Sequence, residues 1–220
     1  GIYADDLGGA FERYFGGRPT ALIRLLEGKA TGRDWCDDRR TAEFVAEMMR
    51  GGAVRARLYD TRKTTPGLRC LEKYAVRCGG GFCHRLGLHD AVLIKDNHIA
   101  GVPLADLARS IADAARRART QRPDLLFIEA EVDSLDQLRQ LLTLEPGLLD
   151  IILLDNMTPD LLRQAVALRD ASRSKPELEA SGGVRLDTLR GIAETGVDRI
   201  SAGTLTHGAS SLDVALDVVS

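Results

Sequence analysis

Short apolar runs recur along the chain at regular intervals, and most of them are too short to form a helix. The runs that we interpret as strands are residues 54–60, 91–95, 125–132, 150–155, 178–181 and 197–201. Apolar runs of this length without strict alternation are typical of strands that are covered on both faces. The pattern begins only at residue 53. We therefore divide the chain into an amino-terminal segment, residues 1–52, and a domain, residues 53–220, and expect helices at 20–27 and 41–50 within the first.

Helical signals lie between the predicted strands. The residues that we expect at helix amino termini, as caps or first residues, are Pro103, Ser134, Thr158 and Asp187. Gly196 is expected to end the last of these helices. Alternation of strand and helix indicates a parallel α/β fold, and about six units are fewer than a closed eightfold barrel contains. The sequence predicts an open, incomplete parallel α/β barrel behind a short, largely helical amino-terminal segment.

Charge and composition exclude several classes of protein. The net charge is -2 and only 5% of residues are aromatic, which argues against a general nucleic-acid binder. No apolar run approaches the ~20 residues of a membrane span, and we recognise no signal peptide. The four cysteines form no CxxC pair, so free thiols in a reducing compartment are the simplest interpretation. We expect a cytoplasmic protein that binds neither nucleic acid nor a membrane.

Polar residues follow the predicted strands, at the end where α/β barrels carry their chemistry. The groups are Asp60–Lys63, Lys95–His98, Asp155–Asn156, Ser181–Gly183 and Ala202–His207. Glu129 and Glu131 share one face of a strand because side chains alternate, and a carboxylate buried there is costly unless a cation or metal pairs with it. The two glycine loops after the last strands offer free backbone N–H groups, which suits a phosphate.

The stretch from Asp60 to His98 is basic on a chain that is acidic overall. It holds seven Arg or Lys against four acids, and three of the four histidines. A local cationic group suits a compact polyanionic ligand better than a long polymer. Each part also has a simpler explanation: Arg62 and Lys63 can be a surface pair, and Arg69, Lys73 and Arg77 at helical spacing can be a solvated helix face.

The residues that carry this chemistry resemble those of a known family. Residues 60–100, "DTRKTTPGLRCLEKYAVRCGGGFCHRLGLHDAVLIKDNHIA", resemble the signature of the quinolinate phosphoribosyltransferases. "EAEVDSLDQL", "DIILLDNM", "EASGGV" and "GVDRISAGTLTH" follow in the family's order. The resemblance covers roughly residues 54–218 and implies a type II phosphoribosyltransferase barrel.

The resemblance implies a decarboxylating pentosyltransferase of de novo NAD biosynthesis. Quinolinate and phosphoribosyl pyrophosphate (PRPP) would give nicotinate mononucleotide, pyrophosphate and CO₂, with Mg²⁺. Catalytic roles are implied for Lys63, Lys95, Glu131 and Asp155, of which Glu131 and Asp155 face the ribose and the metal. The implied quinolinate ligands are Thr61, Arg62, Lys63, His84, Arg85 and Lys95, with Arg18 donated to the partner subunit's site. The implied phosphate ligands are Ser181, Gly182, Gly183, Ala202, Gly203, Thr204 and His207.

Two other interpretations stay open at this point. The family carries a longer α/β sandwich domain before its barrel, so residues 1–52 are a candidate remnant of it. A catalytically idle barrel that still binds a phosphorylated ligand is therefore one alternative. The other is a relative encoded with molybdate transporters, which shares much of the signature but lacks the lysine that matches Lys95. The family also implies a homodimer or a hexamer of dimers.

Overall fold

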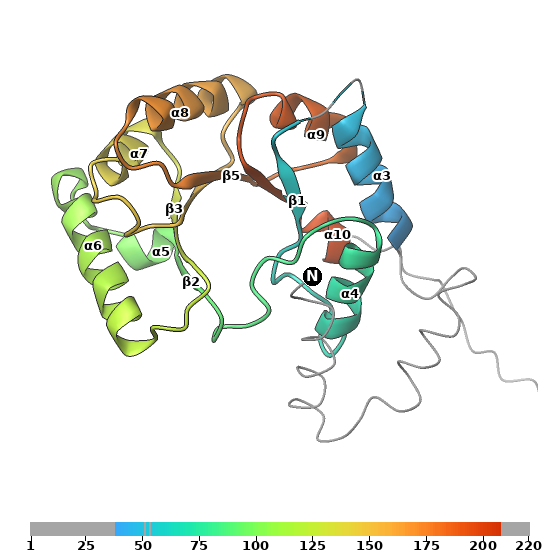
Figure 1. The fold of residues 1–220 in the computed structure, drawn as a ribbon, viewed down its shortest axis with the longest axis horizontal. Helices are drawn as coiled ribbons and strands as arrows, with labels where there is room; N and C mark the ends of the chain where they lie inside the picture. The colour runs from blue at the N-terminus through green and yellow to red at the C-terminus, as the bar shows by residue number, and fades with distance from the viewer. Residues whose placement is uncertain (1–37, 51, 53, 208–220) are drawn as a thin grey trace, which may run out of the picture.

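The computed structural model of the protein describes residues 38–50, 52 and 54–207 (Figure 1). Six parallel strands form one sheet in the order β1-β6-β5-β4-β3-β2. The strands are β1 Arg57–Tyr59, β2 Val92–Ile94, β3 Ile128–Val132, β4 Ile151–Asp155, β5 Glu177–Ser181 and β6 Arg199–Ser201. Because β1 and β2 are the two edges, the barrel is open, and all six strands predicted from the sequence are confirmed.

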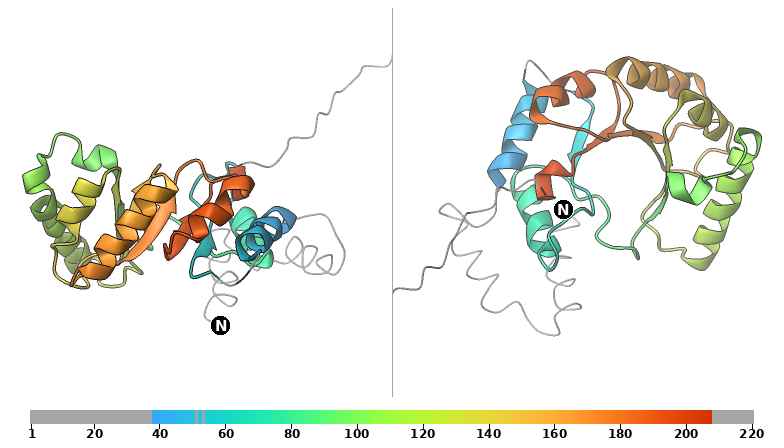
Figure 2. Two further views of the ribbon diagram at one scale, coloured as in Figure 1. Left: turned by 90° about the horizontal axis from the view of Figure 1, so that it is seen from above. Right: turned by 180° about the vertical axis from the view of Figure 1, so that it is seen from behind.

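Helices cover the outside of the curved sheet, and the views in Figures 1 and 2 show the strands around a common interior. The helices are α3 Asp38–Met49, α4 Arg69–Cys78, α5 Asp96–Ile99, α6 Leu104–Gln121, α7 Leu135–Leu141, α8 Pro159–Ala171, α9 Leu186–Ala193 and α10 Thr204–His207. In the described part of the chain, no helix has the length and apolar character needed to cross a membrane.

The predicted helix starts are mostly confirmed. The hydroxyl of Ser134 accepts the Gln137 N–H at 3.4 Å, and that of Thr158 accepts the Leu161 N–H at 3.4 Å. The prediction for Asp187 is wrong, because α9 begins at Leu186 and Arg185, two residues before Asp187, holds the cap position. There the Thr188 hydroxyl accepts the Arg185 N–H at 3.1 Å. The same helix ends at Ala193, before the predicted stop.

The amino-terminal segment is described only in its last part. The predicted helix at 41–50 is present as α3, and the one at 20–27 lies outside the described residues. Figure 1 shows α3 beside α9 and α4. Arg40 donates to the Thr204 carbonyl at 3.0 Å, and Arg190 of α9 donates to the Met48 carbonyl at 2.7 Å. These bonds attach α3 to the barrel.

The two faces of the sheet have opposite character. Outward side chains such as Ile152, Leu154 and Leu178 are buried under the helices in one apolar core. Each such burial contributes roughly 1.5–3 kcal/mol. Inward positions carry the polar set Glu129, Glu131, Glu179, Arg199 and Ser201, all of them buried. The outer face therefore stabilises the fold, and the inner face is free to carry polar chemistry.

Candidate active site

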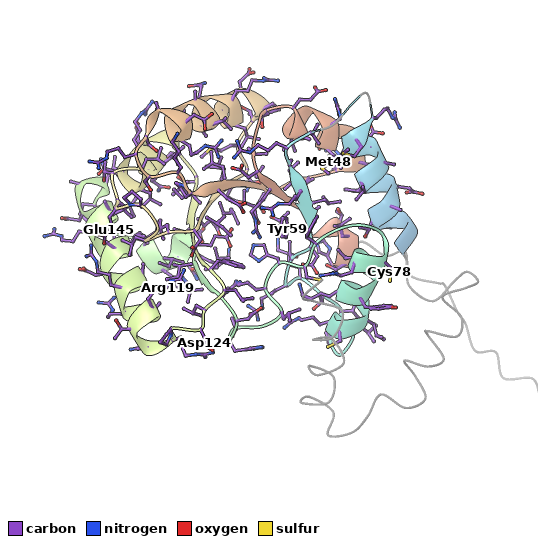
Figure 3. The ribbon with its side chains drawn as sticks, in the orientation of Figure 1. Met48, Tyr59, Cys78, Arg119, Asp124 and Glu145 are labelled. Carbon is purple, nitrogen blue, oxygen red and sulfur yellow. The ribbon has the colours of Figure 1, made fainter. Side chains whose placement is uncertain are left out.

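A cavity of about 320 Å³ lies where the carboxyl ends of the strands meet. Its lining is Thr61, Arg62, Lys63, His84, Arg85, Leu93, Lys95, Glu131, Leu153, Asp155, Glu179, Ser181 and Ser201. Figure 3 shows side chains from the surrounding strands filling the interior of the ring. The cavity thus gathers the predicted quinolinate ligands of the described chain, both predicted metal ligands and Ser181. Arg18 lies outside the described residues.

The remaining predicted phosphate ligands do not line this cavity, but they follow the same strand ends. Gly182 and Gly183 follow β5, while Ala202, Gly203, Thr204 and His207 follow β6. The Thr206 hydroxyl donates to the Lys63 carbonyl at 2.6 Å. A side-chain carbon placed on Gly203 would lie 3.6 Å from Lys63 Cδ and 2.7 Å from His207 Nε2. The loop after β6 is therefore adjacent to the Arg62–Lys63 pair.

Gly182 is required by both backbone conformation and space. Its φ is 90°, and a Cβ there would lie 2.2 Å from Asn156 Oδ1 and 2.9 Å from the Asn156 backbone nitrogen. We expect Gly182→Ala to lower the free energy of unfolding by roughly 1–3 kcal/mol, because it adds a backbone clash to a strained φ. Chemical denaturation measures this loss.

Gly183→Ala is the matched control for that prediction. Gly183 also has a positive φ, 59°, but nothing lies within 4 Å of its added Cβ. The control should cost less, since φ near 60° is the left-handed region that other residues tolerate. Equal losses in the two variants would show that the contact with Asn156 is not what requires Gly182.

Three of the cavity cations have no ion-pair partner in the part of the chain that the structure describes. Among the described residues, Arg62, Lys63 and Arg85 form no ion pair, and Nε of both arginines lacks a hydrogen-bond partner. Burial lowers the pKa of Arg85, and the neighbouring charge of Arg62 lowers it further. Two guanidinium groups that repel each other in a partly dry cavity favour an anion between them, and a carboxylate fits such forks.

Lys95 and Glu131 form an ion pair between two groups that were both predicted for the site. Their Nζ and Oε2 atoms are 2.8 Å apart, and the hydrogen bond to Glu131 raises the pKa of Lys95. Asp155 lines the same cavity and accepts a bond from the Asn156 side chain at 2.7 Å. Carboxylate oxygens are the ligands that Mg²⁺ takes in sites completed by substrate phosphates. Glu131 and Asp155 therefore fit a Mg²⁺ ion that is shared with a substrate.

His84 lies between two buried carboxylates. Its Nε2 is 3.1 Å from Glu129 Oε2 and 3.2 Å from Glu179 Oε1. Burial alone would lower the pKa of His84, but the carboxylates, Glu179 foremost, outweigh it and raise the pKa to about 10. The Arg85 backbone N–H donates to His84 Nδ1 at 2.8 Å. This hydrogen bond favours the neutral imidazole, which carries no proton on Nδ1. One such hydrogen bond contributes roughly 1 kcal/mol, which is less than the attraction between the ring and the carboxylates in a site that excludes water. We therefore expect His84 to be protonated as an imidazolium.

The atoms of His84, Glu129 and Glu179 also approach one another within 4.8 Å, as metal ligands would. Here the spacing has another explanation, because Nε2 of His84 forms an ion pair with each carboxylate. Arg199 adds a second cation, with Nε 2.6 Å from Glu179 Oε2. These two cations lower the pKa of Glu179 to about 2, against the rise that burial alone would cause. The cluster is thus already balanced by charges of the chain itself.

Sequence reasoning missed several residues of the site. Glu179 shares its face of β5 with Ser181, so the alternation that singled out Glu129 and Glu131 could have found it. The solvated-face interpretation is wrong for Lys73, whose side chain is 1% exposed and bonded to the equally buried Asp60. Nothing in the spacing of Arg69, Lys73 and Arg77 marks the middle residue as buried. Lys73 meets Asp60 only because the folded chain places the residue that follows β1 beside it.

Comparison with known proteins identifies relatives of this chain. The family model "Quinolinate phosphoribosyl transferase, C-terminal domain" matches residues 39–217. A probable nicotinate-nucleotide pyrophosphorylase [carboxylating] of Bacillus subtilis is 45% identical over 162 residues, which are 74% of this chain and 52% of that protein. The Mycobacterium leprae nicotinate-nucleotide pyrophosphorylase [carboxylating] is 48% identical over 165 residues, 75% of this chain and 55% of that one.

The structural comparison agrees. The crystal structure of NadC from Streptococcus pyogenes has a TM-score of 0.66 and 38% identity, covering 80% of this chain and 56% of that one. The chain spans about half the length of the curated relatives that it matches.

Proposed function

Because the chain belongs to the quinolinate phosphoribosyltransferase family, we propose that it transfers the phosphoribosyl group of PRPP to quinolinate with loss of CO₂. The products are nicotinate mononucleotide and pyrophosphate, as in de novo NAD biosynthesis. One observation carries the proposal: a single cavity holds the cations Arg62, Lys63, Arg85 and Lys95 together with the carboxylates Glu131 and Asp155. A dicarboxylate acceptor needs the first set, and a cationic ribosyl transition state needs the second.

The acceptor is held by charge and by shape. The unpaired guanidiniums of Arg62 and Arg85 match the two carboxyl groups of quinolinate, since each planar fork can bind a carboxylate in bidentate fashion. Lys63 and Lys95 add point charges and Thr61 adds a hydroxyl. His84 lines the same cavity, with its charge balanced by Glu129 and Glu179. The 5-phosphate of PRPP is assigned to the loops at Ser181–Gly183 and Ala202–Thr204, with His207 beside the second loop.

The chemistry assigned to the chain is electrostatic. Positive charge develops on the ribose as pyrophosphate leaves, and the carboxylates of Glu131 and Asp155 stabilise it. The same two residues are the proposed ligands of Mg²⁺, which would neutralise the charge of the departing pyrophosphate. The pyridine nitrogen attacks the ribosyl carbon as the bond to pyrophosphate breaks. The quaternised ring then releases its adjacent carboxyl group as CO₂, and the ring carbon left with the electron pair takes up a proton from water. The cavity cations orient that carboxyl group throughout.

The proposal extends to assembly and location. We infer a cytoplasmic homodimer or hexamer of dimers in which Arg18 of one chain reaches the site of its partner. Sedimentation of the purified chain tests the assembly, and a monomer that carries full activity would contradict the role of Arg18.

The first experiment incubates the purified chain with quinolinate, PRPP and MgCl₂, and measures nicotinate mononucleotide by chromatography. We expect product, and a rate lower by roughly 100-fold or more in Lys95→Ala, because truncating a charge that holds substrate and Glu131 costs several kcal/mol. Failure to form product while PRPP still binds would contradict the proposal and identify an idle barrel.

A further inference from the structure

An ion pair that sequence analysis did not find lies directly behind the cavity. Lys73 Nζ is 2.7 Å from Asp60 Oδ1 and 2.8 Å from Asp60 Oδ2, and the two residues are 1% and 0% exposed. Asp60 directly follows β1, and Lys73 lies at the middle of α4. A fully buried pair stabilises little by itself, because desolvation offsets most of the attraction. The other contacts of the pair therefore indicate its role.

Those contacts join the two chain segments that carry the cavity cations. Asp60 Oδ1 also accepts the His84 backbone N–H at 2.7 Å, next to Arg85. Lys73 Nζ also lies 3.4 Å from the Thr61 carbonyl, next to Arg62. The segments at 61–63 and 84–85 are far apart in sequence, and neither is part of a strand. One buried pair thus holds both at once.

The same helix holds the rest of the first segment. Arg69 Nη2 lies 3.4 Å from the Arg62 carbonyl, and Arg69 Nε donates to the Thr64 hydroxyl at 3.0 Å. The Glu72 carboxylate accepts the Thr65 N–H at 3.1 Å. With the bond from Thr206 to the Lys63 carbonyl, this leaves the segment little freedom to move while its cationic side chains remain unpaired.

We propose that the Asp60–Lys73 pair is a positioning device that sets the spacing between the Arg62 and Arg85 segments, and thereby the fit of the substrate's two carboxyl groups. The proposal rests on the proposed function, from which it takes quinolinate as the ligand. Asp60 and Lys73 touch no substrate and act through the cations that they hold. A purely stabilising pair would affect folding but would not distinguish one substrate from the other.

The chain supplies a matched control at the opposite end of the barrel. Asp198 is also buried, forms ion pairs with buried Arg169 and with the exposed Arg55, and accepts the Leu178 backbone N–H at 2.9 Å. It directly precedes β6, whereas Asp60 directly follows β1. Asp60→Asn and Asp198→Asn therefore each remove a buried carboxylate charge that is ion-paired and accepts a backbone N–H, one beside the cavity and one away from it.

The experiment compares these two variants in thermal melting and in steady-state kinetics. Both should melt at lower temperature. Only Asp60→Asn should raise KM for quinolinate, by roughly 100-fold, since a misplacement of about 1 Å can cost that much. KM for PRPP should change less, because among the described residues no hydrogen bond or ion pair joins Asp60 or Lys73 to the phosphate loops after β5 and β6. Similar kinetics in the two variants, or parallel losses for both substrates, would overturn the proposal.

Hydrogen exchange of the His84 amide gives a second readout that needs neither activity nor quinolinate. In the wild-type chain this amide should exchange slowly, and Asp60→Asn should speed its exchange and that of Arg85 while Asp198→Asn leaves both unchanged. Rapid exchange in the wild type would overturn the positioning role, even if the variants fail to fold. A wild-type chain that shows this protection but neither binds nor converts quinolinate would reject the proposed function alone.

Discussion

Arg62→Ala is expected to weaken quinolinate binding by two to three orders of magnitude and to leave the fold as stable as before. Truncating one partner of a desolvated charge pair costs 2–5 kcal/mol, or roughly 30- to 4,000-fold in affinity. The cost to folding should be absent because Arg62 forms no ion pair in the described structure and its charge opposes that of Arg85. Weaker binding with unchanged stability is the combination expected of a residue that binds the ligand but does not stabilise the fold.

Calorimetric titration with quinolinate and thermal melting measure the two quantities. Arg62→Lys should recover only part of the affinity, since a lysine keeps the charge but loses the bidentate fork. Arg173→Ala is the control, because Arg173 lines a separate cavity and does not line the one that holds Arg62. Unchanged affinity in Arg62→Ala, or equal loss in the control, would remove Arg62 from the binding set.

The contrast between Arg62 and Lys73 shows what sequence reasoning can reach. Arg62 follows a strand directly, and every parallel strand delivers its carboxyl end to the same edge of the sheet. Its place in the site therefore follows from chain order alone, as do those of Lys95, Glu131, Asp155 and Ser181. Lys73 lies on a helix whose rotation about its own axis depends on packing. No spacing rule states which of three cations on one helix meets a buried acid.

The error at α9 has a different physical origin. Asp187 has the side chain of a good cap, but Thr188 can bond back to the Arg185 N–H, and Asp187 instead bonds the Arg185 side chain at 3.0 Å. Two local hydrogen-bond arrangements thus compete within three residues. Their free energies differ so little that tertiary packing decides between them. By contrast, the hydroxyls of Ser134 and Thr158 accept the backbone N–H three residues on, and their predicted caps are confirmed.

Glu131→Gln should impair catalysis and spare substrate binding, whereas Arg62→Ala should impair binding. We expect kcat to fall by roughly 100- to 1,000-fold, because the carboxylate acts on charge that develops only in the transition state. Substrate binding should hold or become tighter, since the change removes a negative charge from the cavity and releases Lys95 from its 2.8 Å ion pair. The concentration of Mg²⁺ for half-maximal rate should rise, with Asp155 left as the only carboxylate of the proposed metal pair.

Steady-state kinetics across a MgCl₂ series, together with calorimetric titration of quinolinate, test this expectation. Glu145→Gln is the control: Glu145 pairs with Arg116 on the outer surface near α6, where Figure 3 labels it, well away from the cavity. A fall in kcat with unchanged dependence on Mg²⁺ would keep Glu131 as an electrostatic group and remove it as a metal ligand. An unchanged kcat would remove both roles, and Asp155 would then have to carry the charge that the ribosyl transition state requires.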